Sequence, residues 1–201
     1  MSTAIPSQEE LRMLKSPFLA AALLAATLAI PARAQDMKKD APIKPADSPS
    51  KVLLDSWNDI GRKLIAMAED FPEDKYDFKP TPAQRSFAEQ LLHAAGANYF
   101  FINPVTGQKS DVEAMMKRDK YKDKAAIVAF VKKAFADGAA ALQAKGDKGP
   151  SDQIVEPFSH QYFRVDDLAW SFIEHSGEHY GQLVVYYRLA GLVPPESRPK
   201  K

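Results

Sequence analysis

Apolar residues recur at alternating intervals of four and three along several stretches of this chain. In the first of these stretches the repeating residues are Leu53, Trp57, Ile60, Leu64 and Met67. Residues at such spacing lie on one face of an α-helix and pack against neighbouring helices. The sequence therefore predicts a helix that is capped by Ser48 or Ser50 and ends at Phe71 and Pro72.

A second helix is predicted by the segment FAEQLLHAAGANYFF, residues 87–101. Two starts are available: Thr81 with Pro82 and Gln84, or the S-x-x-E capping box of Ser86 and Glu89. Because the segment is apolar on almost every side, this helix should be the most buried. Pro104 and Gly107 are expected to break it, and Ser110 to Glu113 offer the start of a further, short helix.

Two more long helices are predicted over residues 123–145 and 166–190, each followed by glycine. No segment shows the alternation of polar and apolar residues that is typical of a β-strand. Four long helices with apolar faces favour an all-α fold, a four-helix bundle. The connections after the second and third helices are each about twenty residues, so we expect long crossover connections.

The N-terminus has the features of a secretory signal peptide over residues 1–34. Arg12 and Lys15 precede the apolar run 18–30, and Ala32-Arg33-Ala34 then fits a cleavage site. The run is shorter than the about 20 residues of a membrane-spanning helix. We therefore expect a periplasmic or secreted protein with no stable membrane span. An uncleaved N-terminal anchor is the alternative, and translation could start at Met1 or Met13.

The remaining chain divides into three parts. Residues 35–47 are polar and lysine-rich and predict a flexible linker, residues 48–195 the bundle, and residues 196–201 a disordered tail. The formal net charge is +1, and no basic stripe interleaved with aromatic residues is present, so no nucleic-acid partner is expected. The chain contains no cysteine, which excludes disulfides and a thiol nucleophile.

Two histidines share the apolar face of the fourth helix. That face is formed, at spacings of four and three, by Leu168, Phe172, His175, His179, Gln182 and Tyr186. Imidazoles at i and i+4 lie one turn apart on the same side and can reach one ion. On the pair alone, however, a metal-free core is the better explanation.

A third histidine, His93, lies in the middle of the second predicted helix. An imidazole buried without a partner loses roughly 1–3 kcal/mol. One ion would satisfy His93, His175 and His179 together, and three protein ligands leave a coordination position open, as in catalytic sites. The alternative is a metal-free core in which Glu89 is the partner of His93.

Other residues near the pair have two explanations each. Gln182 could orient a ligand or be a core amide, and Glu174 and Glu178 are weak candidates for a general base that fall off the apolar face. His160 is either a loop residue or a fourth ligand. Gly177 and Gly181 favour close approach of a neighbouring helix. Four further residues could line a pocket or a homodimer surface: Tyr180, Tyr186, Tyr187 and Arg188.

The segment FIEHSGEHYGQLVVYYRLAGLVPP resembles the last helix of the DinB-like proteins, the DinB/YfiT-like superfamily. In that family a histidine pair four residues apart is followed by Gly-Gln and a Tyr-x-Arg-x-x-Gly ending. The segment DKYDFKPTPAQRSFAEQLLHAAGANYFF is similar to the family's first connection and second helix. The resemblance extends over about residues 50–195.

This resemblance implies a four-helix bundle with long crossings that holds a divalent metal, zinc before nickel or iron, through His93, His175 and His179. Family members of known chemistry include transferases and isomerases that use small thiols, and the family's link to DNA damage does not imply DNA binding. Because such thiols are chiefly cytoplasmic, export would favour hydrolysis. We expect a metal-dependent hydrolase or transferase acting on a small molecule. A non-catalytic binding protein and a metal-free structural bundle are the alternatives.

Overall fold

The computed structural model describes residues 47–155 and 159–199 of the chain. The predicted signal peptide, residues 1–34, and nearly all of the predicted linker, residues 35–47, lie outside the described residues. The described part contains nearly all of the predicted bundle, residues 48–195.

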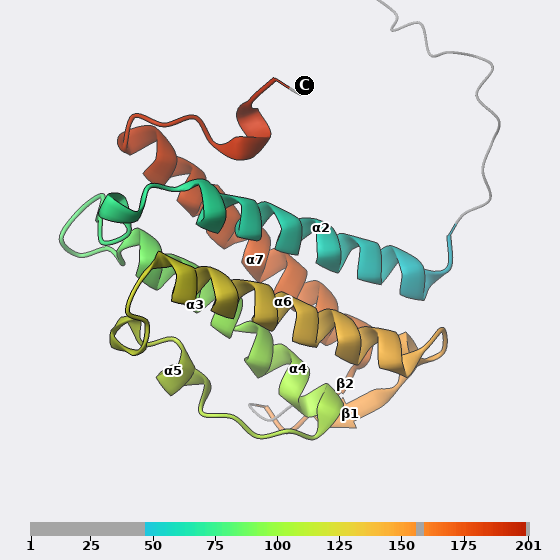
Figure 1. Ribbon diagram of the computed structural model, residues 1–201. Coiled ribbons are helices and arrows are strands. Elements are labelled where there is room, and N and C mark those ends of the chain that lie inside the picture. Colours follow the sequence, from blue (N-terminus) through green and yellow to red (C-terminus); the bar gives the residue numbers. More distant parts are fainter. Residues whose placement is uncertain (1–46, 156–158, 200–201) are drawn as a thin grey trace, which may run out of the picture. The chain divides into compact units, whose positions relative to one another are not determined.

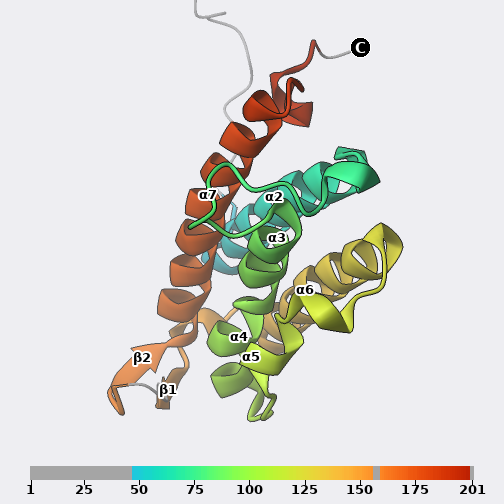
Figure 2. The same ribbon diagram turned by 90° about the vertical axis from the view of Figure 1, so that its left-hand side faces the viewer.

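The described chain forms a four-helix bundle, as predicted (Figure 1). Its long helices are α2 (Pro49–Asp70), α3 (Phe87–Gly96) continued by α4 (Asn98–Thr106), α6 (Lys124–Lys145) and α7 (Val165–Leu189). Both α2 and α3 pack against α6 and α7, so α2 and α3 lie diagonally across the bundle (Figure 2). The helices that carry the three histidines, α3 and α7, are therefore neighbours.

Most helix ends are those that the sequence predicts. The Ser48 hydroxyl accepts a hydrogen bond from the Lys51 amide at 3.3 Å and caps α2. At α3 the capping box of Ser86 and Glu89 forms in both directions, so the alternative start at Thr81 is wrong. Gly146, with φ 64°, follows the last residue of α6.

The predicted second helix is in fact two helices that meet at Ala97. Pro104 does not break α4, because the loss of one backbone donor near its end is tolerated. The helix ends instead at Gly107, whose φ of 71° is left-handed. The next helix, α5 (Val112–Met115), is capped by Asp111 and not by Ser110, which bonds to Asn103.

A short β-hairpin was not predicted. Strands β1 (Gln153–Val155) and β2 (Tyr162–Arg164) pair antiparallel, with Ile154 opposite Phe163. Three residues a strand are too few to show a clear alternation of polar and apolar side chains. The hairpin lies in the long connection between α6 and α7.

Close helix packing occurs at Gly138 in α6, not at the glycines of α7. A Cβ on Gly138 would lie 2.0 Å from the fully buried Trp57 ring, whose Nε1 donates to the Phe135 carbonyl at 3.1 Å. At Gly177 and Gly181, by contrast, a Cβ would have no atom within 4 Å beyond its own helix and chain neighbours. The prediction that a neighbouring helix approaches these two glycines is therefore wrong.

The predicted disordered tail is also partly wrong. A 3₁₀ turn, η5 (Pro195–Ser197), follows α7, and two ion pairs hold this segment to α2. Arg62 contacts Glu196 at 2.6 Å, and Arg198 donates to Asp70 at 2.8 Å. Only residues 200–201 of the predicted tail lie outside the described part. No helix in the described part is long and apolar enough to span a bilayer.

Candidate metal centre

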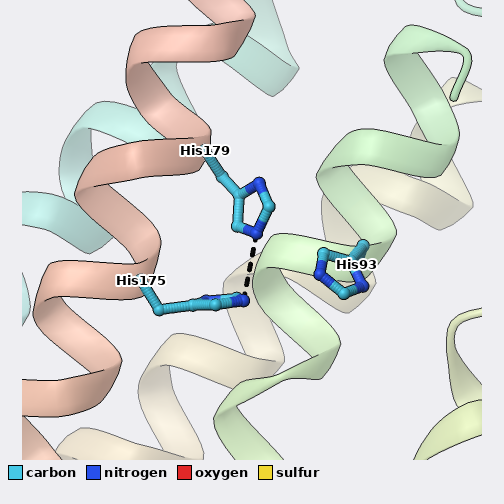
Figure 3. Close-up of side chains that lie close together, drawn as sticks. All are labelled: His93, His175 and His179. Carbon is cyan, nitrogen blue, oxygen red and sulfur yellow. Dashed lines mark hydrogen bonds between the residues drawn. The ribbon is translucent and has the colours of Figure 1, made fainter. Parts of the chain in front are cut away.

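The histidine pair of α7 points toward α3, as the apolar periodicity predicts (Figure 3). The Nε2 atoms of His175 and His179 lie 3.0 Å apart. His179 is only 7% exposed, and His175 is half-buried. Both imidazoles therefore present the same nitrogen to one point between the helices.

His93 completes the group from α3 (Figure 3). Its ring centroid lies 4.7 Å from that of His179 and 5.4 Å from that of His175. One nitrogen from each of the three rings falls within 4.8 Å of the others, and no carboxylate belongs to the group. The structure thus brings together the three histidines that the sequence singled out.

Burial makes these imidazoles neutral near pH 7. The pKa of His93 and of His175 falls from the ordinary 6.5 to about 4, chiefly through burial and in smaller part through the neighbouring histidines and the Arg85 charge. Burial also lowers the pKa of His179, against the opposing effects of Gln182 and Glu178. Neutral imidazole is the form that binds a metal.

Two amides meet the Nδ1 atom of His179. The amide oxygen of Gln182 lies 3.0 Å from it and can only accept, so this pair bonds when Nδ1 carries the proton, whereas the amide nitrogen of Gln90 can only donate and bonds the other tautomer. With the proton on Nδ1, the lone pair of Nε2 is directed toward His175 and His93. Gln182 also bonds to Gln90 of α3, as the explanation of a helix-bridging amide expects, although the residue is exposed rather than in the core.

Gln90 is a site residue that the sequence analysis missed. It is 3% exposed, its amide nitrogen donates to the Gln182 oxygen, and the same nitrogen contacts His179 Nδ1. Its position three residues before His93, on the same face of α3, was the signal that could have identified it.

The other candidates from the sequence lie away from the histidine nitrogens. Glu174 and Glu178 are exposed on α7, consistent with a solvated pair. Glu89 is not the partner of His93, because its carboxylate caps α3 and contacts Lys79 at 3.3 Å. His160 is an exposed residue of the hairpin loop, with φ 56°, and is not part of the group.

The donor set suits a divalent cation. A tetrahedral zinc ion at 2.0–2.1 Å from its ligands separates ligand nitrogens by roughly 3.3 Å, and the two Nε2 atoms of α7 are already 3.0 Å apart. Without a cation, one of these two atoms must donate to the other. Nδ1 of His175 is buried and has no hydrogen-bond partner among the described residues. Three neutral nitrogens with no carboxylate partner fit a metal better than a structural hydrogen-bond network.

A cleft of about 670 Å³ reaches the group at His93. Its walls come from the segment before α3, from α3 itself and from the segment around α5. Its cationic lining residues are Lys79, Arg85, Lys117 and Arg118. A small molecule that enters this cleft would meet His93 before the other two histidines.

The model of the DinB family matches residues 43–198, well over half of the sequence. The chain belongs to the DinB family. The sequence resemblance is thereby confirmed over a slightly longer span than the about 50–195 predicted. No curated protein matches the chain.

Solved DinB-like structures share the fold at low sequence identity. A DinB-like protein from Bacillus cereus is 18% identical with a TM-score of 0.61, over 72% of this chain and 95% of that chain. The DinB-like protein YjoA from Bacillus subtilis is 18% identical with a TM-score of 0.58, over 74% and 99%. YfiT from Bacillus subtilis, described as a probable metal-dependent hydrolase with an unusual four-helix bundle topology, is 16% identical with a TM-score of 0.55, over 75% and 94%.

Proposed function

We propose that this DinB-family protein binds a divalent metal ion through His93, His175 and His179 and uses it in the hydrolysis or group transfer of a small molecule. The observation that carries the proposal is the convergence of three neutral imidazoles from two helices, with no carboxylate among them. Zinc is the ion we expect first, with nickel and iron as alternatives, because three nitrogen ligands and an open position are typical of catalytic zinc.

The protein's own residues would hold and orient this centre. His93 faces the cleft, and the amide oxygen of Gln182 is in place to accept the Nδ1 proton of His179 when Nε2 binds the ion. A bound divalent ion would supply Lewis-acid chemistry at the inner end of the cleft. The aromatic rings of Phe101 and Phe172, at 6.0 Å and 6.4 Å from the His175 ring, shield that side of the group from water.

Non-catalytic binding of a small ligand is the second candidate, and one observation favours it. The side chains that contact the histidine nitrogens from outside the group are the amides of Gln90 and Gln182, which do not exchange protons at neutral pH. The nearby carboxylates of Glu174 and Glu178 point to solvent. A centre whose histidines touch no general acid or base can bind a ligand tightly without turning it over.

Turnover separates the two candidates. Zinc-loaded protein would be assayed with a panel of ester, amide and thiol-transfer substrates, beside the same protein treated with chelator and the His179→Ala variant. The proposal expects activity that disappears in both controls. Zinc-loaded protein without turnover but with retained metal would favour the binding function, and turnover insensitive to chelator would contradict metal catalysis.

We also propose that the protein is exported and cleaved after Ala34, on the evidence of the apolar run 18–30 and the Ala32-Arg33-Ala34 pattern. An exported location disfavours thiol-dependent transfer and favours hydrolysis within the proposal above. The mass of the protein recovered from the periplasm or medium would test it: a chain beginning at Gln35 is expected, and an intact chain held in the cytoplasm would contradict it.

A further inference from the structure

The cleft beside His93 contains cationic side chains of two kinds. Two of them already have carboxylate partners: Lys79 contacts Glu89 at 3.3 Å, and Arg118 contacts Asp77 at 3.0 Å. For the other two, Arg85 and Lys117, neither an ion pair nor a side-chain hydrogen bond is found within the described ranges 47–155 and 159–199. The guanidinium of Arg85 is therefore available to a ligand.

The backbone of Arg85 is nevertheless held in place. It directly precedes Ser86, the capping residue of α3, and its carbonyl accepts a hydrogen bond from the Tyr186 hydroxyl of α7 at 2.7 Å. Arg85 and His93 line the same cleft, and the charge of Arg85 contributes to the lowered pKa of all three histidines. An anchored backbone thus carries a free cationic group near the centre.

The charge of the cleft is unbalanced when a metal is bound. Four cationic side chains lie in its lining with three carboxylates, those of Glu89, Glu113 and Asp119, and Asp77 outside the lining pairs with Arg118, so the side chains alone are balanced. Neutral imidazoles do not offset the two charges of a divalent ion. The occupied cleft would therefore be cationic overall, and it would favour a ligand that carries negative charge.

We propose that the ligand of this cleft carries an oxyanionic group, a carboxylate or a phosphate, which Arg85 binds while the rest of the molecule lies against His93. The inference rests on the proposed metal function and names the class of molecule that this site would accept. A planar guanidinium can donate two parallel hydrogen bonds to either group, which fixes the orientation as well as the position of the ligand.

The test uses succinate and inorganic phosphate as probes, titrated calorimetrically into the zinc-loaded full chain. Variants are Arg85→Met, which removes the charge, and Arg85→Lys, which retains it. Arg188→Met is the matched control, because Arg188 is exposed on α7 and does not line the cleft. Arg85→Gln repeats the charge removal if Arg85→Met folds poorly.

At least one probe is expected to bind the parent, with a dissociation constant that rises about tenfold or more in Arg85→Met. It should rise less in Arg85→Lys and stay unchanged in Arg188→Met. The probe that depends more strongly on Arg85 identifies the preferred group. Equal binding by the parent and Arg85→Met, or no binding of either probe to zinc-loaded parent, would overturn the inference.

Zinc content is measured in the same samples, which separates the two proposals. A parent that takes up no zinc defeats the metal function, and with it this inference. A parent that holds zinc but binds both probes independently of Arg85 overturns only the oxyanion site.

Discussion

Nδ1 of His179 and the amide oxygen of Gln182 lie 3.0 Å apart, one turn from each other on α7. The contact joins a candidate metal ligand to an acceptor that stabilises the tautomer with a free Nε2 lone pair. Groups in this position tune metal affinity without touching the ion.

Gln182→Ala is expected to weaken zinc binding by about 10- to 100-fold, because His179 loses the acceptor for its Nδ1 proton. Competition with a coloured chelator would measure the change. Gln161→Ala, in the exposed hairpin loop, is the matched control and should bind zinc as the parent does. Unchanged affinity in Gln182→Ala would show that His179 does not need this acceptor.

Gln90→Ala should weaken zinc binding in the same direction, and the double variant with Gln182→Ala should lose less than the two single effects combined. The reason is that both amides act on His179 and also bond to each other. The same competition assay on the parent, the two single variants and the double variant gives the coupling free energy between Gln90 and Gln182. Fully additive losses would mean that the two amides act independently.

The sequence predicted the bundle well because each long helix repeats its apolar face over several turns. It also predicted that His175 and His179 face inward, since both lie on the face of Phe172. Gln90 was missed because a polar residue in a nearly all-apolar helix has no periodic signal of its own. Its role depends on which helix lies opposite, and that is decided by tertiary packing.

The glycines show more clearly that the sequence does not reveal which helix packs against a given residue. Gly138 and Gly181 both lie inside long helices, and neither has a side chain whose polarity would show what packs against it. In the structure a Cβ on Gly138 would overlap Trp57, whereas a Cβ on Gly181 would meet open space. The hairpin of residues 153–164 was missed because its strands are too short to show a period.

Gly181→Ala should therefore raise the free energy of unfolding by roughly 0.5–1 kcal/mol, the helix-propensity difference between the two residues. Gly138→Ala should lower it, by about 1–3 kcal/mol, because the added methyl overpacks the core against Trp57. Urea denaturation of the parent and both variants measures these changes in the free energy of unfolding. A destabilised Gly181→Ala would mean that another surface, such as that of a second chain in the homodimer considered above, packs against α7.

The stability of the metal-free protein should fall as the pH decreases from about 6.5 to about 4. In this window the unfolded chain binds protons on histidines of ordinary pKa 6.5, whereas the pKa values of His93 and His175 in the folded chain are lowered to about 4. The unfolded state then holds more protons, so the contribution is fully present above pH 6.5 and lost on acidification.

Urea denaturation across this pH range would measure the dependence. The His93→Gln/His175→Gln double variant should show a flatter profile, while His160→Gln, in the exposed loop, should follow the parent. A parent profile as flat as that of the double variant would contradict the burial of neutral imidazoles.

Metal stoichiometry tests the central claim most directly. The purified parent and the variants His93→Ala, His175→Ala, His179→Ala and His160→Ala would be reconstituted with zinc, dialysed and analysed for metal by mass spectrometry. The account predicts about one ion per chain in the parent and in His160→Ala, and far less in the other three, since each loses one of three ligands. A parent that retains no stoichiometric zinc, nickel or iron, or three variants that retain as much as the parent, would contradict it.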